Sequence, residues 1–387
     1  MARSRRNVPQ PKAHSALSID NVSKLYGTAP ALDPISFDIN TGDRVALIGH
    51  NGSGKTNTLD AIHYLSVTKS YFNSVDSQNI NHNAPFFVVE GWFERDENEE
   101  QIYCGLKRGQ KKTFKRNQKE YDRISAHIGL IPLVIISPSD VDLILEGSEV
   151  RRKFMDAVIS QSDSLYLNDL MAYNKTLSQR NALLKYFAAN RVFDQEQLGI
   201  YNDILKERGT RIFEKRIQFI EILKPLLLEY YNHIAGQEEQ VSVDYTSHLH
   251  ELDWDEIFNK NLERDRVLQY TSQGIHRDDL KFSLFEYPLK KTGSQGQQKS
   301  FLIALKLAQF EFLKNFNKSK PLLLLDDIFD KLDESRVESL IKLVNQHHFG
   351  QIFITDTHPE RTIDITKRIN EESRVFEVTK GEIHEKN

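Results

Sequence analysis

The pattern of hydrophobic and polar positions divides the chain into three stretches. Between residues 17 and 103, short apolar or alternating runs such as 45–48 stand between turn residues and predict β-strands. Between 149 and 235, glycine and proline are nearly absent and apolar residues recur at helical spacing. From about residue 241 the strand pattern returns, with a very apolar run at 322–325. The pattern therefore predicts an α/β fold that is interrupted by a helical segment.

The central segment predicts two long helices that pack against each other as a short antiparallel arm. Their apolar faces are formed by Tyr166, Leu170, Tyr173, Leu177 and Leu184 in the first helix, and by Leu205, Ile212, Phe219 and Leu223 in the second. The arm lacks the long run of heptads that structural-maintenance-of-chromosomes (SMC) proteins place between their two half-heads, and it has no Cys-x-x-Cys at its tip.

Composition narrows the class of protein. No run approaches the roughly 18 consecutive apolar residues that a membrane-spanning helix needs. Residues 1–16 are basic, contain two prolines and lack the apolar core of a signal peptide, so we expect a disordered leader and no export. The single cysteine, Cys104, excludes an internal disulfide framework and a multi-cysteine zinc site, and we expect a cytoplasmic location. With a net charge of −4, nucleic acid would have to be met by a local basic patch.

Residues 49–56, Gly-His-Asn-Gly-Ser-Gly-Lys-Thr, match the complete P-loop pattern between a predicted strand and a predicted helix. Glycines let such a loop turn so that its backbone amides point at phosphate oxygens, and the positive end of the following helix adds to the attraction. Lys55 is expected to reach the β- and γ-phosphates, and the Thr56 hydroxyl to hold Mg²⁺. The pattern predicts binding of ATP and Mg²⁺ through Gly49, His50, Asn51, Gly52, Ser53, Gly54, Lys55, Thr56 and Asn57.

The apolar run 322–325 ends in two carboxylates, Asp326 and Asp327. A buried strand of this kind delivers its last residues to the carboxyl edge of a sheet, where α/β proteins bind their ligands. We expect Asp326 to position the metal, directly or through water, and Asp327 to orient and deprotonate the attacking water. A core strand with an acidic cap is the alternative.

Residues 294–299, Ser-Gln-Gly-Gln-Gln-Lys, precede a long helical run and resemble the signature motif of ABC-type ATPases. In that family, serine and glycine at a helix start grip the γ-phosphate that is bound to the other subunit, which is an anion at the positive end of a helix. The resemblance implies that Ser294, Gly296 and Gln297 contact the partner's nucleotide. A plain helix cap with Ser294 as the N-cap residue is the alternative.

Three further residues match other positions of the ABC-type family. Asp333, in the segment 331–333 after the carboxylate strand, matches the D-loop near the dimer seam. His358 follows the predicted strand 351–355 where the family has its switch histidine, which senses the γ-phosphate; a surface histidine is the alternative. Gln78 is a candidate for the Q-loop glutamine at the metal, against a solvent-facing glutamine.

Eight further segments from Thr58 onward are distinctive: LDAIHYL at 59–65, SYF at 70–72, DSQNI at 76–80, YCGLK at 103–107, SPSD at 137–140, GSEVRRKFMD at 147–156, GIHRDDL at 274–280 and SQGQQKS at 294–300. In these segments the chain resembles the RecF family of bacterial recombination mediators. The resemblance implies a two-lobed, SMC-like head, an ATP-dependent homodimer and weak DNA-stimulated ATPase activity. It also implies double-stranded and gapped DNA as ligands, and partnership with RecR and, through RecR, with RecO.

Residues 17–57 resemble instead the ATP-binding subunit of ABC transporters, in the segments 18–27, 35–39 and 42–45. In those subunits an aromatic residue at the position of Tyr26 stacks on adenine. The chain thus resembles a hybrid whose two parts join at the P-loop. Ile275, where the RecF family usually has proline, is a smaller departure.

A basic stripe with Phe114 among its charges lies between residues 107 and 123. Such a stripe can neutralise several phosphates and give sequence-independent, salt-sensitive affinity. A solvated hairpin tip is the alternative, and one of the two arginines at the start of the arm could instead brace the lobe through an ion pair. The predicted DNA contacts are Lys107, Arg108, Lys111, Lys112, Lys115, Arg116, Arg151 and Arg152.

Together, these features predict an α/β P-loop NTPase head of ABC type, with a mixed sheet and flanking helices, and a second, mainly helical lobe. The predicted domains are 17–135 for the first part of the head, 136–265 for the helical lobe, and 266–387 for the second part of the head. We expect an ATPase of recombinational repair and replication restart that clamps DNA at single-strand gaps and helps to load recombinase.

Two other functions compete with this prediction. A transporter ATP-binding subunit is the runner-up, although its signature usually reads Leu-Ser-Gly-Gly-Gln and a glutamate usually stands where this chain has Asp327. A non-catalytic, ATP-gated scaffold is the third hypothesis.

Overall fold

The computed structural model describes residues 15–26, 29–40, 44–73, 75–81, 84–95, 98–317, 319–329, 332–346, 349–369, 373–379 and 381–386. For residues 15–40 it describes the backbone only. Almost all of the predicted leader therefore lies outside the described residues, as do Lys331 and the side chain of Tyr26.

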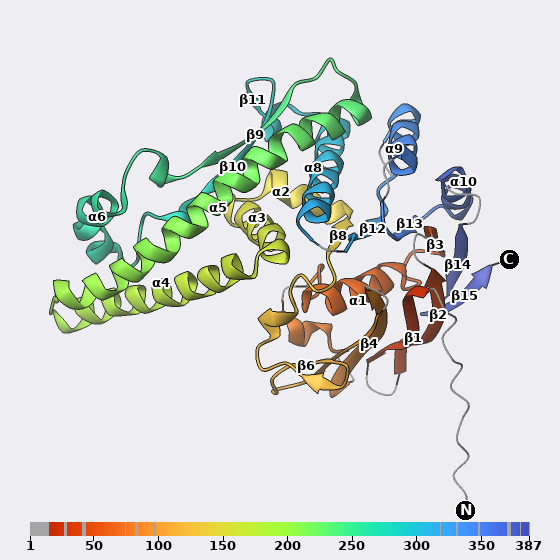
Figure 1. The fold of residues 1–387 in the computed structure, drawn as a ribbon, viewed down its shortest axis with the longest axis horizontal. Helices are drawn as coiled ribbons and strands as arrows, with labels where there is room; N and C mark the ends of the chain where they lie inside the picture. Colours follow the sequence, from red (N-terminus) through yellow and green to blue (C-terminus); the bar gives the residue numbers. More distant parts are fainter. Residues whose placement is uncertain are drawn as a thin grey trace, which may run out of the picture.

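Two six-stranded sheets form the head (Figure 1). The first is antiparallel and consists, in spatial order, of β2 (Ala29–Asn40), β1 (Ser15–Tyr26), β4 (Phe86–Arg95), β5 (Asn98–Lys107), β6 (Thr113–Arg116) and β7 (Lys119–Glu120). The second is parallel except for its first strand and consists of β15 (Glu382–Lys386), β14 (Arg374–Thr379), β3 (Arg44–Ile48), β13 (Ile352–Thr355), β12 (Leu322–Asp326) and β8 (Leu133–Ile136).

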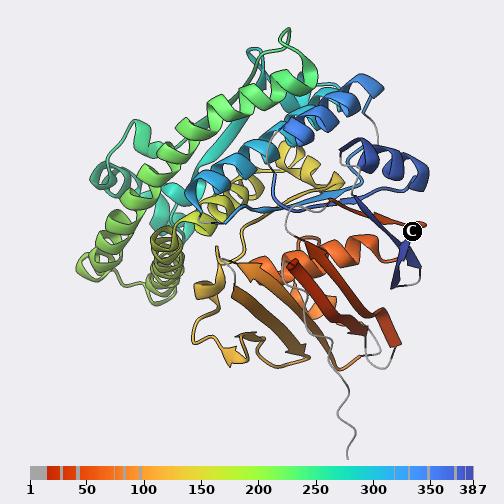
Figure 2. The ribbon, with the colours of Figure 1, turned by 45° about the vertical axis from the view of Figure 1, so that its right-hand side comes forward.

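The central parallel strands are apolar throughout because both faces of their sheet are covered. Leu324 and Phe353 point into a core that they share with α1 (Lys55–Val67) and the antiparallel sheet. Their neighbours in the same strands, Leu323 and Ile354, belong to the core on the opposite face of the sheet. Figure 2 shows the helices over that face, which are α8 (Gln295–Phe316), α9 (Glu334–Gln346) and α10 (Pro359–Ile369). The strands predicted at 45–48 and 322–325 are confirmed as β3 and β12.

The second lobe is mainly helical, as predicted. Its arm is formed by α4 (Ser164–Asn190) and α5 (Gln195–Ala235), which lie side by side in Figure 1. The other elements are α2 (Asp142–Leu145), α3 (Ser148–Ser162), α6 (Trp254–Leu268), α7 (Leu289–Thr292) and a small sheet of β11 (Tyr287–Pro288), β10 (Asp279–Leu284) and β9 (Val241–Thr246).

The helical faces expected from the sequence are those that pack. Tyr166, Tyr173 and Leu184 of α4 are buried, and Leu170 and Leu177 are partly buried. All four residues predicted on α5 are buried as well. The helix α5 continues past the start of α4 and packs on α8, so one continuous core joins the lobe to the head. The domain boundaries at 135 and 265 stay a prediction.

Among the helices that the structure describes, none has both the length and the apolar character needed to cross a bilayer.

Candidate nucleotide site

The segment 49–54 forms a loop between the end of β3 and the start of α1. A Cβ atom on Gly49 would lie 2.3 Å from the carbonyl oxygen of Val378 in the neighbouring strand β14, so the loop passes too close to that strand for any side chain. Gly52 has a φ of 77°, in the left-handed region that favours glycine. The tight, glycine-dependent turn expected of a P-loop is therefore present at the predicted position.

Several groups of this loop could hold an anion. The first turn of α1 has no side-chain cap, so its amides depend on another acceptor. The Ser53 hydroxyl is buried and has no hydrogen-bond partner among the described residues. The Lys55 ammonium donates to the carbonyl oxygens of Gly49 at 2.6 Å and His50 at 3.1 Å. Burial lowers the pKa of Lys55, and the nearby carboxylates oppose this effect. An orphaned hydroxyl, an uncapped helix start and a lysine thus share one small loop.

Asp326 lies at the carboxyl end of β12 and is buried. Its Oδ1 accepts from the Thr56 hydroxyl at 3.1 Å and from the Thr355 hydroxyl at 2.6 Å. Burial raises the pKa of Asp326, and the Thr355 hydrogen bond opposes the rise. The structure therefore brings together the two residues predicted at the metal, although they are 270 positions apart in the sequence.

Asp327 follows directly, with a φ of 49° and an amide that donates to the carbonyl oxygen of Thr355 at 3.2 Å. The Asp327 carboxylate is near enough to contribute to the raised pKa of Asp326, so both carboxylates of the pair lie at the sheet edge that also carries the loop. Its catalytic role stays a prediction.

Two residues at this edge were missed by the sequence analysis. Thr355 lies opposite Asp326 in the parallel pairing of β13 with β12. Asp356 comes next, is fully buried, and pairs with Arg361 at 2.8 Å. The apolar run before them was a usable signal, but its place between β3 and β12 could not be read from the sequence.

His358 lies at the start of α10, where its carbonyl oxygen accepts from the amide of Thr362 at 3.0 Å and its own amide donates to Asp356 at 3.0 Å. Its side chain is exposed. This position, just beyond the sheet edge, is compatible with both a sensing role and a surface histidine.

The segment 294–299 begins α8 with a capping box. The Ser294 hydroxyl accepts from the Gln297 amide at 3.2 Å, and the Gln297 side chain accepts from the Ser294 amide at 2.8 Å. The helix-cap interpretation is thus correct, and it leaves the signature role open because both need the same helix start. In Figure 1, α8 begins near β11, at the end of the helix that is remote from β3. No described contact joins Ser294 to the chain's own loop at 49–56.

Arg336 connects two of the predicted dimer residues and was not foreseen. Its amide donates to Asp333 Oδ1 at 2.9 Å, and its guanidinium lies 3.3 Å from Asp333 Oδ2. A Cβ on Gly296 would stand 2.6 Å from Arg336 Nη1. Gly296 and Asp333 of one chain therefore both lie beside Arg336.

Gln78 is not brought to the loop by any described contact. It lies in the 3₁₀ helix η1 (Asp76–Asn79), and its side chain is exposed. The neighbouring Asp76 accepts from Tyr64 at 2.7 Å, in the second half of α1, whereas Lys55 and Thr56 begin that helix. The solvent-facing alternative fits this position better, and a role for Gln78 at the metal stays a prediction.

Several members of the predicted basic stripe are engaged within the chain. Lys112 pairs with Asp76 at 2.8 Å, and Arg116 pairs with Glu100, to which its Nε donates at 2.7 Å. Arg108 donates to three backbone carbonyl groups of residues 80–84. These contacts brace the β5–β6 hairpin and leave fewer cations for a polyanion than the sequence suggests.

The remaining basic candidates also divide into side chains that are engaged within the chain and side chains that are exposed. Lys107 and Lys111 are exposed and have no partner among the described residues, and the Lys115 ammonium lies 5.4 Å from the ring centre of Tyr103. Arg151 forms a two-pronged ion pair with Asp279 at 2.7 and 3.0 Å, which is the bracing role left open by the sequence. Arg152 donates to the carbonyl oxygen of Asp278 at 2.7 Å.

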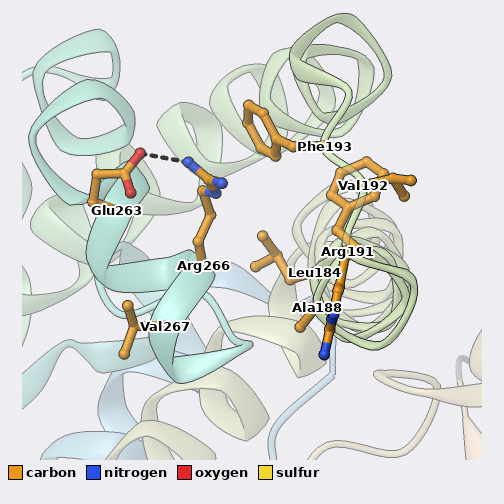
Figure 3. Close-up of a pocket in the computed structure, with 9 residues that line it drawn as sticks. Leu184, Ala188, Arg191, Val192, Phe193, Glu263, Arg266 and Val267 are labelled. Carbon is orange, nitrogen blue, oxygen red and sulfur yellow. Dashed lines mark hydrogen bonds and ion pairs between the residues drawn. The ribbon is translucent and has the colours of Figure 1, made fainter.

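A cavity of about 370 Å³ lies between the end of α4 and α6, far along the chain from these groups (Figure 3). Its walls include Phe187, Val192 and Arg266, and the Arg266 guanidinium stacks 4.3 Å from the ring centre of Phe193 while it pairs with Glu263 at 2.7 Å. None of the residues predicted to bind nucleotide or DNA lines this cavity.

Comparison with known proteins gives one consistent result. A family model for the RecF/RecN/SMC N-terminal domain matches residues 33–384. The DNA replication and repair protein RecF of Flavobacterium johnsoniae is 56% identical over 340 residues, which cover 88% of this chain and 94% of that protein. RecF of Phocaeicola vulgatus is 51% identical over 341 residues, with 88% and 91% covered.

Solved structures agree with the sequence relatives. A structure of the recombination mediator protein RecF with ATP, in the RecFOR pathway, superposes with a TM-score of 0.83 at 29% identity and covers 97% of this chain and 99% of that one. An Smc head domain from Pyrococcus furiosus, at 16% identity and a TM-score of 0.54, shares the fold. None of these proteins is a transporter subunit, so the runner-up prediction gains no support from them.

Proposed function

The chain belongs to the RecF family of DNA replication and repair proteins, and from this membership we propose that it binds ATP in the loop 49–57 and joins a second copy around the nucleotide. The observation that carries the proposal is the meeting of Thr56 and Asp326 beside a loop that has an uncapped helix start and an orphaned hydroxyl. A polyphosphate satisfies the amides and the Ser53 hydroxyl together.

Mg²⁺ fits the oxygen atoms at the same edge. This cation prefers oxygen ligands and is commonly held by one or two carboxylates together with substrate phosphates. The Thr56 hydroxyl and the Asp326 carboxylate would hold it, and the bound cation would neutralise charge on the phosphate oxygens. Lys55 would exchange the carbonyl oxygens of Gly49 and His50 for phosphate oxygens.

The proposed reaction is hydrolysis of ATP to ADP and phosphate. Asp327 accepts a proton from the attacking water while the water oxygen forms a bond to the γ-phosphorus. The bond between the γ-phosphorus and the oxygen that bridges it to the β-phosphate breaks. His358, just beyond β13, would sense the γ-phosphate. Little covalent chemistry is required of the protein, because positioning and electrostatics supply most of the catalysis in phosphoryl transfer.

A second copy is proposed because no described contact joins the signature segment 294–299 to the chain's own loop. Ser294 is exposed at the start of α8, and the exposed Asp333 lies beside it through Arg336. In the proposed dimer Ser294, Gly296 and Gln297 of one copy close the nucleotide site of the other. The positive end of α8 then faces the γ-phosphate.

DNA is the proposed macromolecular ligand. The exposed Lys107 and Lys111, with Lys115 beside them, are the best candidates for phosphate contacts, since their ammonium groups form no ion pair among the described residues. We expect weak ATPase activity that DNA stimulates, a preference for gapped duplex, partnership with RecR and through it RecO, and a cytoplasmic location. The non-catalytic scaffold predicts instead that phosphate release is absent with and without DNA.

The test is size-exclusion chromatography of the purified chain with ATP and Mg²⁺, with and without gapped duplex. We expect a shift from monomer to dimer that Lys55→Ala abolishes together with nucleotide binding. Lys206→Ala is a matched control, because Lys206 lies on the arm in an exposed pair with Asp255. A wild-type chain that stays monomeric at saturating nucleotide, with DNA present, refutes the proposal.

A further inference from the structure

Two buried polar side chains, Lys306 and Asp140, meet the partly buried Tyr71 where α8 packs beside the segment that follows α1. Lys306, in the middle of α8, and Asp140, in the 3₁₀ helix η3 (Pro138–Val141), are 5% and 4% exposed and form an ion pair of 2.7 Å. The Tyr71 hydroxyl donates to the same carboxylate oxygen and accepts from Lys306 Nζ at 3.1 Å. Burial disfavours the charged lysine, but Asp140 and Tyr71 outweigh it and hold the pKa of Lys306 above its ordinary value. Lys306 therefore stays charged inside the protein.

This group is attached to the helix that starts at the phosphate loop. The Tyr71 amide donates to Asp60 Oδ1 at 2.8 Å, and the Ser70 hydroxyl donates to Asp60 Oδ2 at 2.8 Å. Asp60 belongs to α1, five positions after Lys55, and His63 of the same helix packs its ring on Tyr71 with 5.2 Å between ring centres. A displacement of α1 therefore moves Tyr71 with it.

The same group is attached to the carboxylate edge of the sheet. The second carboxylate oxygen of Asp140 accepts from the Ser137 amide at 2.8 Å. Ser137 follows β8, in which Ile136 lies opposite Leu325 of β12, so Ser137 is level with Asp326. The Asp140 carboxylate thus holds both Ser137, at the end of β8 next to the strand that carries Asp326, and Lys306 of α8.

The third attachment leads to the signature segment. Lys306 lies twelve positions after Ser294 on the same helix, about 18 Å along its axis at 1.5 Å per residue. A helix transmits a rotation over this distance because its backbone hydrogen bonds keep it stiff. A buried ion pair contributes little net stability compared with apolar packing, whereas its directed hydrogen bonds fix a geometry.

We propose that Tyr71, Asp140 and Lys306 are positioning residues that set α8 relative to α1 and thereby couple the two nucleotide sites of the dimer. The inference rests on the proposed function, in which each copy gives its loop to one site and its α8 start to the other. Nucleotide in the loop shifts α1, Tyr71 carries the shift to Lys306, and the Ser294 end of α8 moves at the second site.

The helical lobe provides a matched control. The Tyr166 hydroxyl donates to Asp156, and Arg216 lies 2.9 Å from the same carboxylate and 3.2 Å from the Tyr166 oxygen. This second tyrosine–aspartate–cation group joins α3, α4 and α5 and touches neither α1 nor α8 through its hydrogen bonds. Tyr71→Phe and Tyr166→Phe therefore remove the same hydroxyl from the same kind of group, and only the first would break the connection.

The test compares wild type, Tyr71→Phe and Tyr166→Phe in the full-length chain, by the dependence of phosphate release on ATP concentration and by the ATP affinity of the dilute monomer. We expect a Hill coefficient near two for wild type and Tyr166→Phe, and near one for Tyr71→Phe, with unchanged monomer affinity in all three. Asp140→Asn, which keeps the shape of the side chain, should repeat the Tyr71→Phe result.

The outcomes separate the two proposals. If Tyr71→Phe keeps the wild-type Hill coefficient, or if Tyr166→Phe lowers it equally, the positioning role is overturned while the ATPase stands. If wild type dimerises with ATP but hydrolyses it without cooperativity, the coupling is likewise overturned. If wild type neither binds ATP nor dimerises, the proposed function fails first and the inference falls with it.

Discussion

Replacing Gly49 with alanine tests the geometry on which the nucleotide site depends. The new Cβ would lie 2.3 Å from the carbonyl oxygen of Val378, and contacts below 3.0 Å essentially do not occur, so the two atoms must separate by at least 0.7 Å. A backbone carbonyl in β14 cannot rotate away as a side chain can. Overpacking of this kind costs about 1–3 kcal/mol, and the φ of 150° adds roughly 1–3 kcal/mol for a residue with a side chain.

The loop yields more easily than the paired strand, so we expect most of this cost to appear as lost nucleotide affinity. At 1.4 kcal/mol per factor of ten, a loss of 2 kcal/mol or more weakens binding by at least about 30-fold. The assay is titration with a fluorescent ATP analogue, accompanied by thermal unfolding. Gly52→Ala is the control, because a Cβ there meets nothing within 4 Å and only its φ of 77° is strained, at about 1–2 kcal/mol. If Gly49→Ala binds nucleotide at least as well as Gly52→Ala, the close approach of the loop to β14 is wrong.

Three further outcomes follow from the site and the core. Asp327→Asn keeps the size of the side chain but removes the base, so phosphate release should fall by about 100-fold or more while nucleotide binding and the DNA-bound dimer persist; normal hydrolysis would refute the role of Asp327. Burial lowers the pKa of three histidines to about 4, so they stay neutral in the native chain, and protonation of the unfolded chain alone should reduce the free energy of unfolding as the pH falls from 7 to 5. The three residues are His63, His127 and His276. The reduction in unfolding free energy is about 2 kcal/mol for each histidine and is measured by urea unfolding at both pH values. A free energy of unfolding that is unchanged or higher at pH 5 contradicts this prediction. Arg151→Ala should lower the unfolding free energy by about 1–3 kcal/mol through loss of the Asp279 pair, whereas Lys111→Ala should leave it unchanged and reduce the salt slope of DNA binding by about one; equal stability losses would contradict this division.

The helix that starts at Ser294 is an element that neighbouring residues in the sequence are enough to predict. Its capping box needs only Ser294 and Gln297, three positions apart, and both the cap and the helix could be predicted from them. The phosphate loop was equally local, since a strand, a glycine pattern and a helix follow one another directly within residues 44–67. The apolar faces of α4 and α5 were predictable for the same reason, as periodicity is a property of neighbours.

The basic residues show the opposite case. Lys107 and Lys112 look alike in the sequence, but folding places Asp76 beside Lys112 and leaves Lys107 exposed. Gln78 fits a sequence pattern, but its 3₁₀ helix η1 contacts Tyr64 in the second half of α1, and no described contact joins Gln78 to Thr56. In both cases the deciding contact comes from another segment of the chain, 36 positions away for Lys112 and 12 positions away for Asp76 beside Gln78.

The sequence by itself determined the loop, the carboxylate strand, the helix caps and the resemblance that defines the family, because each depends on short-range backbone preferences and spacing. Only the tertiary structure decided that Thr355 and Asp356 share an edge with Thr56, that Arg336 joins Asp333 to Gly296, and that Lys306 lies under Tyr71. The physical reason is that strand order and helix packing choose these neighbours from distant parts of the chain, and no local pattern carries that choice.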